Sequence, residues 1–244
     1  GIDRAARRAG RTDVRLILKP MADGGEGSLG ILAGDEGEYH PVETFDALMR
    51  PVQSAYAVLP GNSGKYAAVE AASAVGLYRL DREERNPLRT TSYGVGKVMR
   101  EAIEAGCTEL IAAVGGTAAT GHDCRAVAGS GAAGGIAWAL KTFCGADFIP
   151  GAASIAALTG TDAAIRKAAL AVTGEGRFDS QSLHGKVAGH IASFAHAHGI
   201  PTIVLCGSRG EDMTADILAP AGISALFALT DRVPRHEAFT RPAE

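Results

Sequence analysis

Residues 170–177 read Leu-Ala-Val-Thr-Gly-Glu-Gly-Arg, an apolar stretch that runs directly into glycines and charged side chains. The same pattern, a short apolar strand followed by a glycine-rich loop, occurs three more times. The apolar stretches are Val14–Leu18, Leu110–Val114 and Thr202–Leu205, and the loops after them contain Asp23–Gly27, Gly115–Thr117 and Cys206–Ser208. Strands of this kind, alternating with helical segments, are typical of a largely parallel sheet with crossovers. The sequence therefore predicts an α/β fold.

The segments between these strands carry apolar residues at helical spacing. We expect helices over residues 93–105, 135–143 and 186–198, and the first dozen residues read as the end of a helix that feeds Val14–Leu18. Residues 40–80 differ, because two strand-like runs, Pro51–Leu59 and Tyr66–Glu70, flank the turn sequence Pro60–Gly64. This is a hairpin signature and predicts a second domain with antiparallel strands, inserted into the first.

Composition narrows the classes of partner. The 244 residues carry a net charge of -3 with no basic stripe, which argues against nucleic acid. The four cysteines are widely spaced, which favours a reduced, cytoplasmic setting without disulfides. No apolar run reaches the roughly 18 residues of a membrane span, and the polar N-terminus does not resemble a signal peptide. The lack of an initiator Met suggests that the true start lies upstream.

The stretch from Gly115 to Gly135 places two glycine-rich loops back to back, with no strand or helix between them. A structureless connection of about 20 residues is uncommon inside a domain. We therefore expect that a piece of chain is missing near residues 120–128. Within this stretch Gly129, Gly131 and Gly134 form a G-x-G-x-x-G pattern, but no clear strand precedes it and no acidic strand end follows. A nicotinamide-dependent oxidoreductase is therefore a weak alternative.

Two segments combine glycine with carboxylates. Asp23 and Glu26 lie three residues apart on a glycine turn, where they could hold Mg²⁺ through oxygen ligands; the alternative is a solvated surface turn. The second segment, Thr173–Gln181, continues to Gly185–Lys186. There Arg177 and Lys186 could clamp a phosphate or a carboxylate, while Glu175 or Asp179 could bind metal or accept a proton. No Walker A sequence is present, so any ATP chemistry needs another phosphate cradle.

Thr91 and Ser92 precede the helix expected from Tyr93 and are placed as N-caps. A capped helix start is also an anion site, so plain capping and ligand binding both remain open. The seven histidines form no credible metal set.

Taken in order, these loops resemble the bacterial glycerate kinase type 1 family, over nearly the whole chain. The matching motifs are Pro20–Gly27, Asn86–Pro87 with Thr91–Gly94, Gly115–Ala118, Gly129–Gly135, and Thr173–Arg177 with Asp179, Gln181 and Gly185–Lys186. Each motif alone is modest, but the ordered series is specific.

The resemblance implies an ATP- and Mg²⁺-dependent phosphorylation of D-glycerate, giving 2-phosphoglycerate or 3-phosphoglycerate. It also implies two α/β domains: a Rossmann-like domain from residues 1–39 and 162–244, and an inserted domain with a mixed sheet from residues 40–161. The active site would lie in the cleft between them. The oligomeric state, including a homo-oligomer, stays open.

The site residues carried over fall into three groups. The catalytic group is Glu175, Arg177, Asp179 and Lys186. The substrate- or nucleotide-binding group is Asp23, Gly24, Gly25, Glu26, Thr91, Ser92, Gly115, Gly116, Thr117, Gly131 and Gln181. The metal ligands are Asp23, Glu26 and Asp179.

Two departures from the family pattern matter. This sequence begins after the family's first strand and its Asp-Ser-Phe-Lys-Gly loop, and it lacks the Asn-Asp-Gly-Gly turn that follows the Gly115 loop in the family. The alternative reading is therefore a truncated, non-catalytic protein of the same fold that binds small hydroxy acids.

Overall fold

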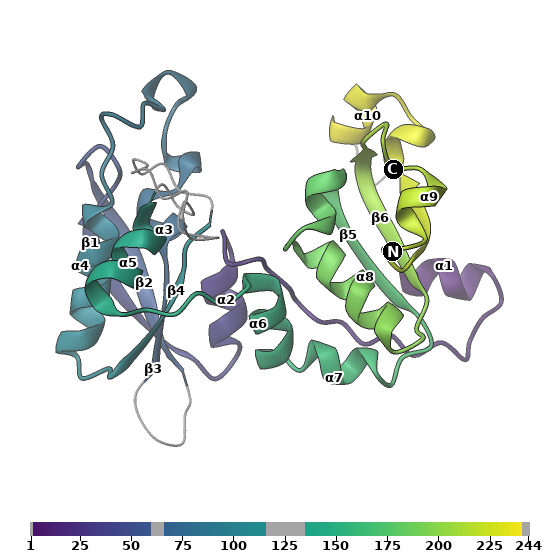
Figure 1. Ribbon diagram of the computed structural model, residues 1–244, viewed down its shortest axis with the longest axis horizontal. Helices are drawn as coiled ribbons and strands as arrows, with labels where there is room; N and C mark the ends of the chain where they lie inside the picture. Colours follow the sequence, from purple (N-terminus) through teal and green to yellow (C-terminus); the bar gives the residue numbers. More distant parts are fainter. Residues whose placement is uncertain (1, 60–65, 116–134, 241–244) are drawn as a thin grey trace.

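The computed structural model describes residues 2–59, 66–115 and 135–240, which form two lobes that each contain a sheet (Figure 1). The first sheet has the order β1-β2-β3-β4. Its strands are β1 (Glu38–Phe45), β2 (Pro51–Leu59), β3 (Tyr66–Glu70) and β4 (Glu109–Ala113). β1, β2 and β3 pair antiparallel, and β3 pairs parallel with β4. The hairpin predicted from Pro51–Leu59 and Tyr66–Glu70 is confirmed as β2–β3.

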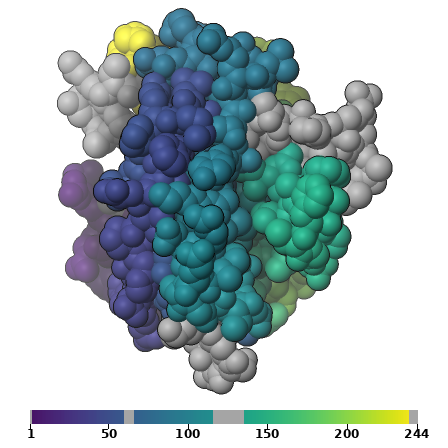
Figure 2. Space-filling model, turned by 90° about the vertical axis from the view of Figure 1, so that its left-hand side faces the viewer, coloured from purple at the N-terminus to yellow at the C-terminus, as the bar shows by residue number. Residues whose placement is uncertain are grey.

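Helices cover both faces of this sheet. On one face α3 (Ala71–Val75), α4 (Tyr93–Glu104) and α5 (Ile136–Cys144) close a core that includes Val69, Val98 and Ile136. Figure 2 looks at this lobe with α4 in teal and α5 in green on its surface. On the other face α2 (Ser28–Ala33) packs Leu29 and Ala33 against Ala57 and Ala68 of β2 and β3.

The second sheet is fully parallel, with the order β5-β6-β7. Its strands are β5 (Ala171–Phe178), β6 (Thr202–Arg209) and β7 (Ile223–Ala228). One face is covered by α8 (Val187–Ala197), which packs Ala188 and Ala192 against Phe178 and Val204. The remaining helices are α1 (Ile2–Arg8), α6 (Gly151–Leu158), α7 (Thr161–Ile165), α9 (Ala215–Leu218) and α10 (Arg235–Thr240), with short 3₁₀ turns η1 (Leu77–Arg79), η2 (Arg82–Glu84), η4 (Ser180–Leu183) and η5 (Leu229–Asp231). A mixed sheet and a parallel sheet confirm the predicted α/β class.

One predicted strand is wrong. Residues 14–18 form an extended connection between α1 and α2 that pairs with none of the described strands, and the Leu18 side chain is 85% exposed. An apolar run becomes a strand only where a neighbouring strand satisfies its backbone N–H and C=O groups. Without that partner, the apolar composition of residues 14–18 was a misleading signal.

Two predicted loops are also wrong. Residues 173–177 belong to β5, and residues 206–208 belong to β6. The glycines in these stretches allow close strand contact, because a Cβ built on Gly174 would lie 2.0 Å from the carbonyl oxygen of Leu205. Glycine in a strand often marks such a close backbone approach, which the sequence pattern did not distinguish from a loop.

The domain limits drawn at residues 39 and 162 stay a prediction. Within the segment 1–39, however, α2 packs on the β1–β4 sheet and adds to the core of that lobe. Among the described residues, none of the helices is both long and apolar enough to cross a lipid bilayer.

Candidate functional site

The glycine turn at Asp23–Gly27 is held by backbone contacts from two other segments. Gly115, just after β4, donates its N–H to the carbonyl of Gly24 at 2.9 Å. A Cβ on Gly115 would lie 2.7 Å from the Cα of Gly25, and a Cβ on Gly151 would lie 2.1 Å from the carbonyl oxygen of Asp23. Only glycine permits these approaches. The turn is therefore fixed between the end of β4 and the start of α6.

The two carboxylates on this turn reach solvent. Asp23 and Glu26 are exposed, and Asp23 Oδ1 accepts a hydrogen bond of 3.3 Å from the N–H of Gly25. Gly24 and Gly27 have φ values of 95° and 84°, a left-handed conformation that suits glycine. The fixed backbone thus presents two acidic side chains at the carboxyl end of β4.

The predicted metal set is not assembled. In the part of the chain that the structure describes, no three His, Cys, Asp or Glu side chains gather closely enough to hold a metal ion. Asp23, Glu26 and Asp179 therefore do not form a three-carboxylate cage. Mg²⁺ in phosphoryl-transfer enzymes usually takes one or two carboxylates and completes its shell with water and phosphate oxygens. Asp23 and Glu26 fit that more open arrangement.

Sequence reasoning missed Glu70, which stands behind this turn. Glu70 is the last residue of β3 and is only 6% exposed, and its Oε2 accepts a hydrogen bond of 2.9 Å from the N–H of Leu29 in α2. The neighbouring Ser28 is fully buried, and its hydroxyl has no partner among the described residues. The feature of the sequence that could have indicated Glu70 is its position, a carboxylate directly after the apolar run Tyr66–Val69. Glu70 ties the helix after the glycine turn to the sheet.

Thr91 and Ser92 lie at the other edge of the same sheet. Ser92 is the N-cap of α4, but its side chain makes no capping hydrogen bond; instead Thr91 Oγ1 accepts from the N–H of Tyr93 at 3.2 Å. The N–H of Thr91 donates to the carbonyl of Ala47, just beyond β1. Because β1 and β4 are opposite edge strands, this pair is separated from Gly115 by the width of the sheet.

The end of β5 forms a compact charged turn. Asp179 Oδ2 accepts from Arg177 Nε at 3.2 Å, and its Oδ1 accepts from the N–H of Gln181 at 3.1 Å. Asp179 is thus both the N-cap of η4 and the partner of Arg177. A carboxylate with both oxygens engaged is better suited to orienting the guanidinium than to accepting a substrate proton.

Glu175 occupies a different environment, inside β5. Its Oε1 is buried without a hydrogen-bond partner among the described residues, and it is the register partner of Cys206 in β6. Burial raises the pKa of the Cys206 thiol, and the negative charges of Asp231 and Glu175 raise it further. An unsatisfied buried carboxylate oxygen is costly, so Glu175 is a position where a bound ligand or ion would supply the missing partner.

Lys186 is the N-cap of α8 and adjoins a small hollow of about 180 Å³ between α6 and α8. That hollow is lined by Pro150, Ala152, Ala153, Leu183, Gly185, Gly189, His190 and Ser193. α6 thus lies between the two turns. Its Gly151 contacts Asp23 of the Asp23–Gly27 turn, and its Ala152 and Ala153 line the hollow beside the Gly185–Lys186 turn.

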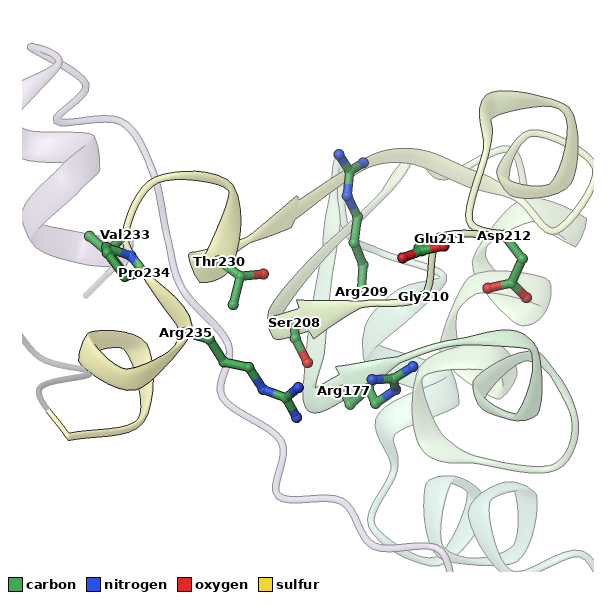
Figure 3. A pocket seen from close by; sticks show the side chains of 10 residues that line it. All are labelled: Arg177, Ser208, Arg209, Gly210, Glu211, Asp212, Thr230, Val233, Pro234 and Arg235. Carbon is green, nitrogen blue, oxygen red and sulfur yellow. The ribbon is translucent and has the colours of Figure 1, made fainter.

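A larger pocket, of about 590 Å³, opens at the carboxyl ends of β5 and β6 (Figure 3). It is lined by Arg177, Ser208, Arg209, Gly210, Glu211, Asp212, Thr230, Val233, Pro234 and Arg235. Arg209 is held by Asp231 through an ion pair of 3.2 Å. Three guanidiniums line the pocket together with the carboxylates of Glu211 and Asp212, and the part lined by the arginines is suited to an anion.

Most of this lining could not be assigned from sequence. The strand-to-glycine pattern indicated β6 but ended the strand too early, at Leu205 instead of Arg209, and Arg177 belonged to the predicted catalytic group. Arg235 carried no local signal, because it approaches the pocket from the start of α10. Three predicted residues, Gly116, Thr117 and Gly131, lie outside the described residues.

Comparisons with known proteins give a consistent result. The model of the Glycerate kinase family matches the chain in two segments, residues 2–124 and 117–244. A glycerate kinase of Halalkalibacterium halodurans is 26% identical over 90% of this chain and 82% of its own length. A glycerate kinase of Bacillus subtilis is 25% identical, with 92% and 84% covered, and a glycerate 2-kinase of Escherichia coli is 26% identical, with 89% and 82% covered.

A solved structure agrees at the level of the fold. The crystal structure described as a glycerate kinase 2 from Salmonella typhimurium LT2 has a TM-score of 0.69 and 24% identity, and the match covers 97% of this chain and 88% of the other. The alignments with the three curated relatives span 316 to 325 positions, more than the 244 residues here, so those relatives contain residues that this chain lacks. Since the family model matches both segments of the chain, the protein belongs to the glycerate kinase family, whose members are enzymes that phosphorylate glycerate.

Proposed function

We propose that this protein transfers the γ-phosphate of ATP to D-glycerate and forms 2-phosphoglycerate. The observation that carries the proposal is the family match, which runs through both lobes and includes the Asp23–Gly27 and Thr173–Lys186 segments. The choice of the 2-hydroxyl is supported by the Escherichia coli relative, which is a glycerate 2-kinase.

The chemistry at such a site is mainly positioning and charge stabilisation, because the phosphoryl group is transferred with little covalent participation by the protein. Asp23 and Glu26 would hold Mg²⁺ on the fixed glycine turn. Both carboxylates are exposed, and two carboxylates are enough because water and phosphate oxygens would fill the rest of the coordination shell. When bound, Mg²⁺ neutralises charge on the β- and γ-phosphates.

The residues of the β5–β7 lobe would act on the phosphates and the acceptor. Arg177, oriented by Asp179, would stabilise the charge that develops on the transferred group, and Lys186 would add a second positive charge from the start of α8. Glu175, with its unsatisfied buried oxygen, would accept a hydrogen bond from the hydroxyl that is phosphorylated.

An assay coupled to enolase determines which hydroxyl of glycerate is phosphorylated. Protein is incubated with MgATP and D-glycerate, and enolase is then added with no phosphoglycerate mutase. Enolase dehydrates 2-phosphoglycerate but not 3-phosphoglycerate, so immediate formation of phosphoenolpyruvate supports the proposal. Phosphoenolpyruvate that appears only after mutase is added would assign the 3-hydroxyl instead.

A further inference from the structure

The pocket at the carboxyl ends of β5 and β6 is built from side chains that are already oriented. Arg177 Nε contacts Asp179 Oδ2 at 3.2 Å, and Arg209 Nε contacts Asp231 Oδ1 at 3.2 Å. Each guanidinium carries five N–H donors, so one such contact fixes the side chain and leaves donors for a ligand. A pre-oriented arginine loses less conformational entropy when it binds.

The charges in this pocket are not spread evenly. Arg177 and Arg235 both line the pocket; in Figure 3 the Arg235 guanidinium lies below Ser208, the Arg177 guanidinium points away from that of Arg235, and the carboxylates of Glu211 and Asp212 lie beyond Gly210. Ser208 is 7% exposed, so its hydroxyl sits at the inner wall. The lining of the pocket thus includes two positive charges and a hydroxyl, a donor set that suits phosphate oxygens.

The size of the pocket is compatible with a nucleotide. A volume of about 590 Å³ lies within the range of roughly 300–1,000 Å³ that is usual for small-molecule and cofactor sites. Glycerate has few non-hydrogen atoms and would leave most of this space to water. Val233 and Pro234 add apolar surface that a base could contact. The carboxyl ends of parallel strands are also where open α/β sheets bind nucleotides.

We propose that this pocket binds the nucleotide, with its polyphosphate contacting Arg177, Arg235 and Ser208. It supplies the phosphate cradle that a chain without a Walker A sequence needs. The inference rests on the proposed kinase activity only for the choice of ATP as the nucleotide, because the pocket geometry is independent of the acceptor.

Titration of the protein with MgADP by calorimetry, at fixed ionic strength, tests the inference. Arg235→Gln removes a guanidinium and should weaken MgADP binding roughly 10-fold to 100-fold, the equivalent of one hydrogen-bonded charged contact. Ser208→Ala should weaken it severalfold with little risk to folding. Lys167→Gln, which removes one positive charge from an exposed position in the same lobe, is the matched control and should bind as the wild type does. Inorganic tripolyphosphate should displace MgADP from the wild type.

Wild-type protein that binds no MgADP, or MgADP affinity within twofold of wild type in both pocket variants, would overturn the inference. Pocket variants with a raised KM for glycerate but unchanged MgADP affinity would overturn it too, and would indicate that the pocket binds glycerate. If wild-type protein binds MgADP and Arg235→Gln weakens binding, but glycerate is not phosphorylated, the inference stands and the proposed acceptor fails.

Discussion

Arg177 is the residue on which most of the proposed chemistry depends, through its guanidinium group. It lies at the end of β5, contacts Asp179, and lines the large pocket. We expect Arg177→Ala to lower kcat/KM for glycerate phosphorylation by roughly 10²-fold or more, as for the loss of one transition-state donor. Asp179→Asn can still accept from the N–H of Gln181 but loses the ion pair, so it should show a smaller loss of the same kind.

Steady-state kinetics of both variants, with MgATP and D-glycerate varied in turn, checks this expectation. If each variant kept kcat/KM within twofold of the wild type, the assignment of the β5 turn to the reaction would be wrong.

Asp46 is the clearest case of a charge that stabilises the fold. Burial opposes its ionisation, but the N–H groups of Arg50 and Leu48 and the Arg50 guanidinium outweigh burial and hold the pKa of Asp46 below its usual range. A lowered folded pKa means that this stabilisation is complete above the unfolded value of about 3.9 and is lost as the pH falls through the folded value.

We therefore expect Asp46→Asn to lower the free energy of unfolding by about 1.5–3 kcal/mol at neutral pH, the value of a charged hydrogen bond, with a smaller difference from wild type near pH 3. Urea unfolding at both pH values measures this. Asp13→Asn is the control, because Asp13 also pairs with an arginine but is 68% exposed, and it should leave stability almost unchanged. Equal effects of the two substitutions would contradict the account.

At this scale the sequence indicated some site residues and missed others for a physical reason. Arg177, Asp179 and Gln181 were predicted as neighbours because they are close in the sequence, and hydrogen bonds to Asp179 do join them, while their roles stay a prediction. Glu70, Ser208 and Arg235 reach their sites from three separate elements, and only the fold brings them near residues that a motif had marked.

At the scale of elements, the glycines of the Thr173–Arg177 motif have different roles. A Cβ on Gly174 would collide with the carbonyl oxygen of Leu205, whereas a Cβ on Gly176 would meet no atom within 4 Å. Gly174→Ala should push β5 from β6 and lower stability by about 1–3 kcal/mol, as overpacking does, while Gly176→Ala should be tolerated. Thermal unfolding of the two variants decides the point, and comparable melting temperatures would show that the β5–β6 pairing is looser than described.

The link between β3 and α2 gives another element-scale prediction. Glu70→Ala removes the acceptor for the N–H of Leu29 and should cost about 1–3 kcal/mol of stability and reduce kcat, because the glycine turn before α2 loses its support. Glu70→Gln keeps an acceptor of the same shape and should restore both properties. Stability and kcat are measured on the same preparations. If Gln is as damaging as Ala, the charge of Glu70 and not its hydrogen bond is what matters.

The predicted elements were correct where periodicity and pairing agreed. The residues of α4, β4 and the β2–β3 hairpin followed from spacing and turn residues alone. Residues 14–18 did not form a strand, because strand formation depends on a partner that local sequence does not specify. The glycine-rich parts of β5 and β6 read as loops, because the need for glycine between two close strands appears only when the strands are paired.

At the scale of the whole molecule, the two lobes contribute different parts of the proposed site. The β1–β4 lobe presents Asp23 and Glu26 on a turn held by Gly115, and the β5–β7 lobe presents the arginine-lined pocket. α6 lies between them, touching Asp23 through Gly151 and lining the hollow next to Gly185 through Ala152. In the proposed mechanism phosphoryl transfer uses both parts, since the turn supplies the proposed Mg²⁺ ligands and the pocket supplies the proposed phosphate donors.

The most direct test of the proposed kinase activity is ADP release from MgATP, measured on the 244-residue protein with and without D-glycerate. We expect ADP formation that depends on D-glycerate and saturates with it. Well-folded protein that releases no more ADP with D-glycerate than without it would contradict the proposed activity, and would favour a protein of this fold that binds a small hydroxy acid without phosphorylating it.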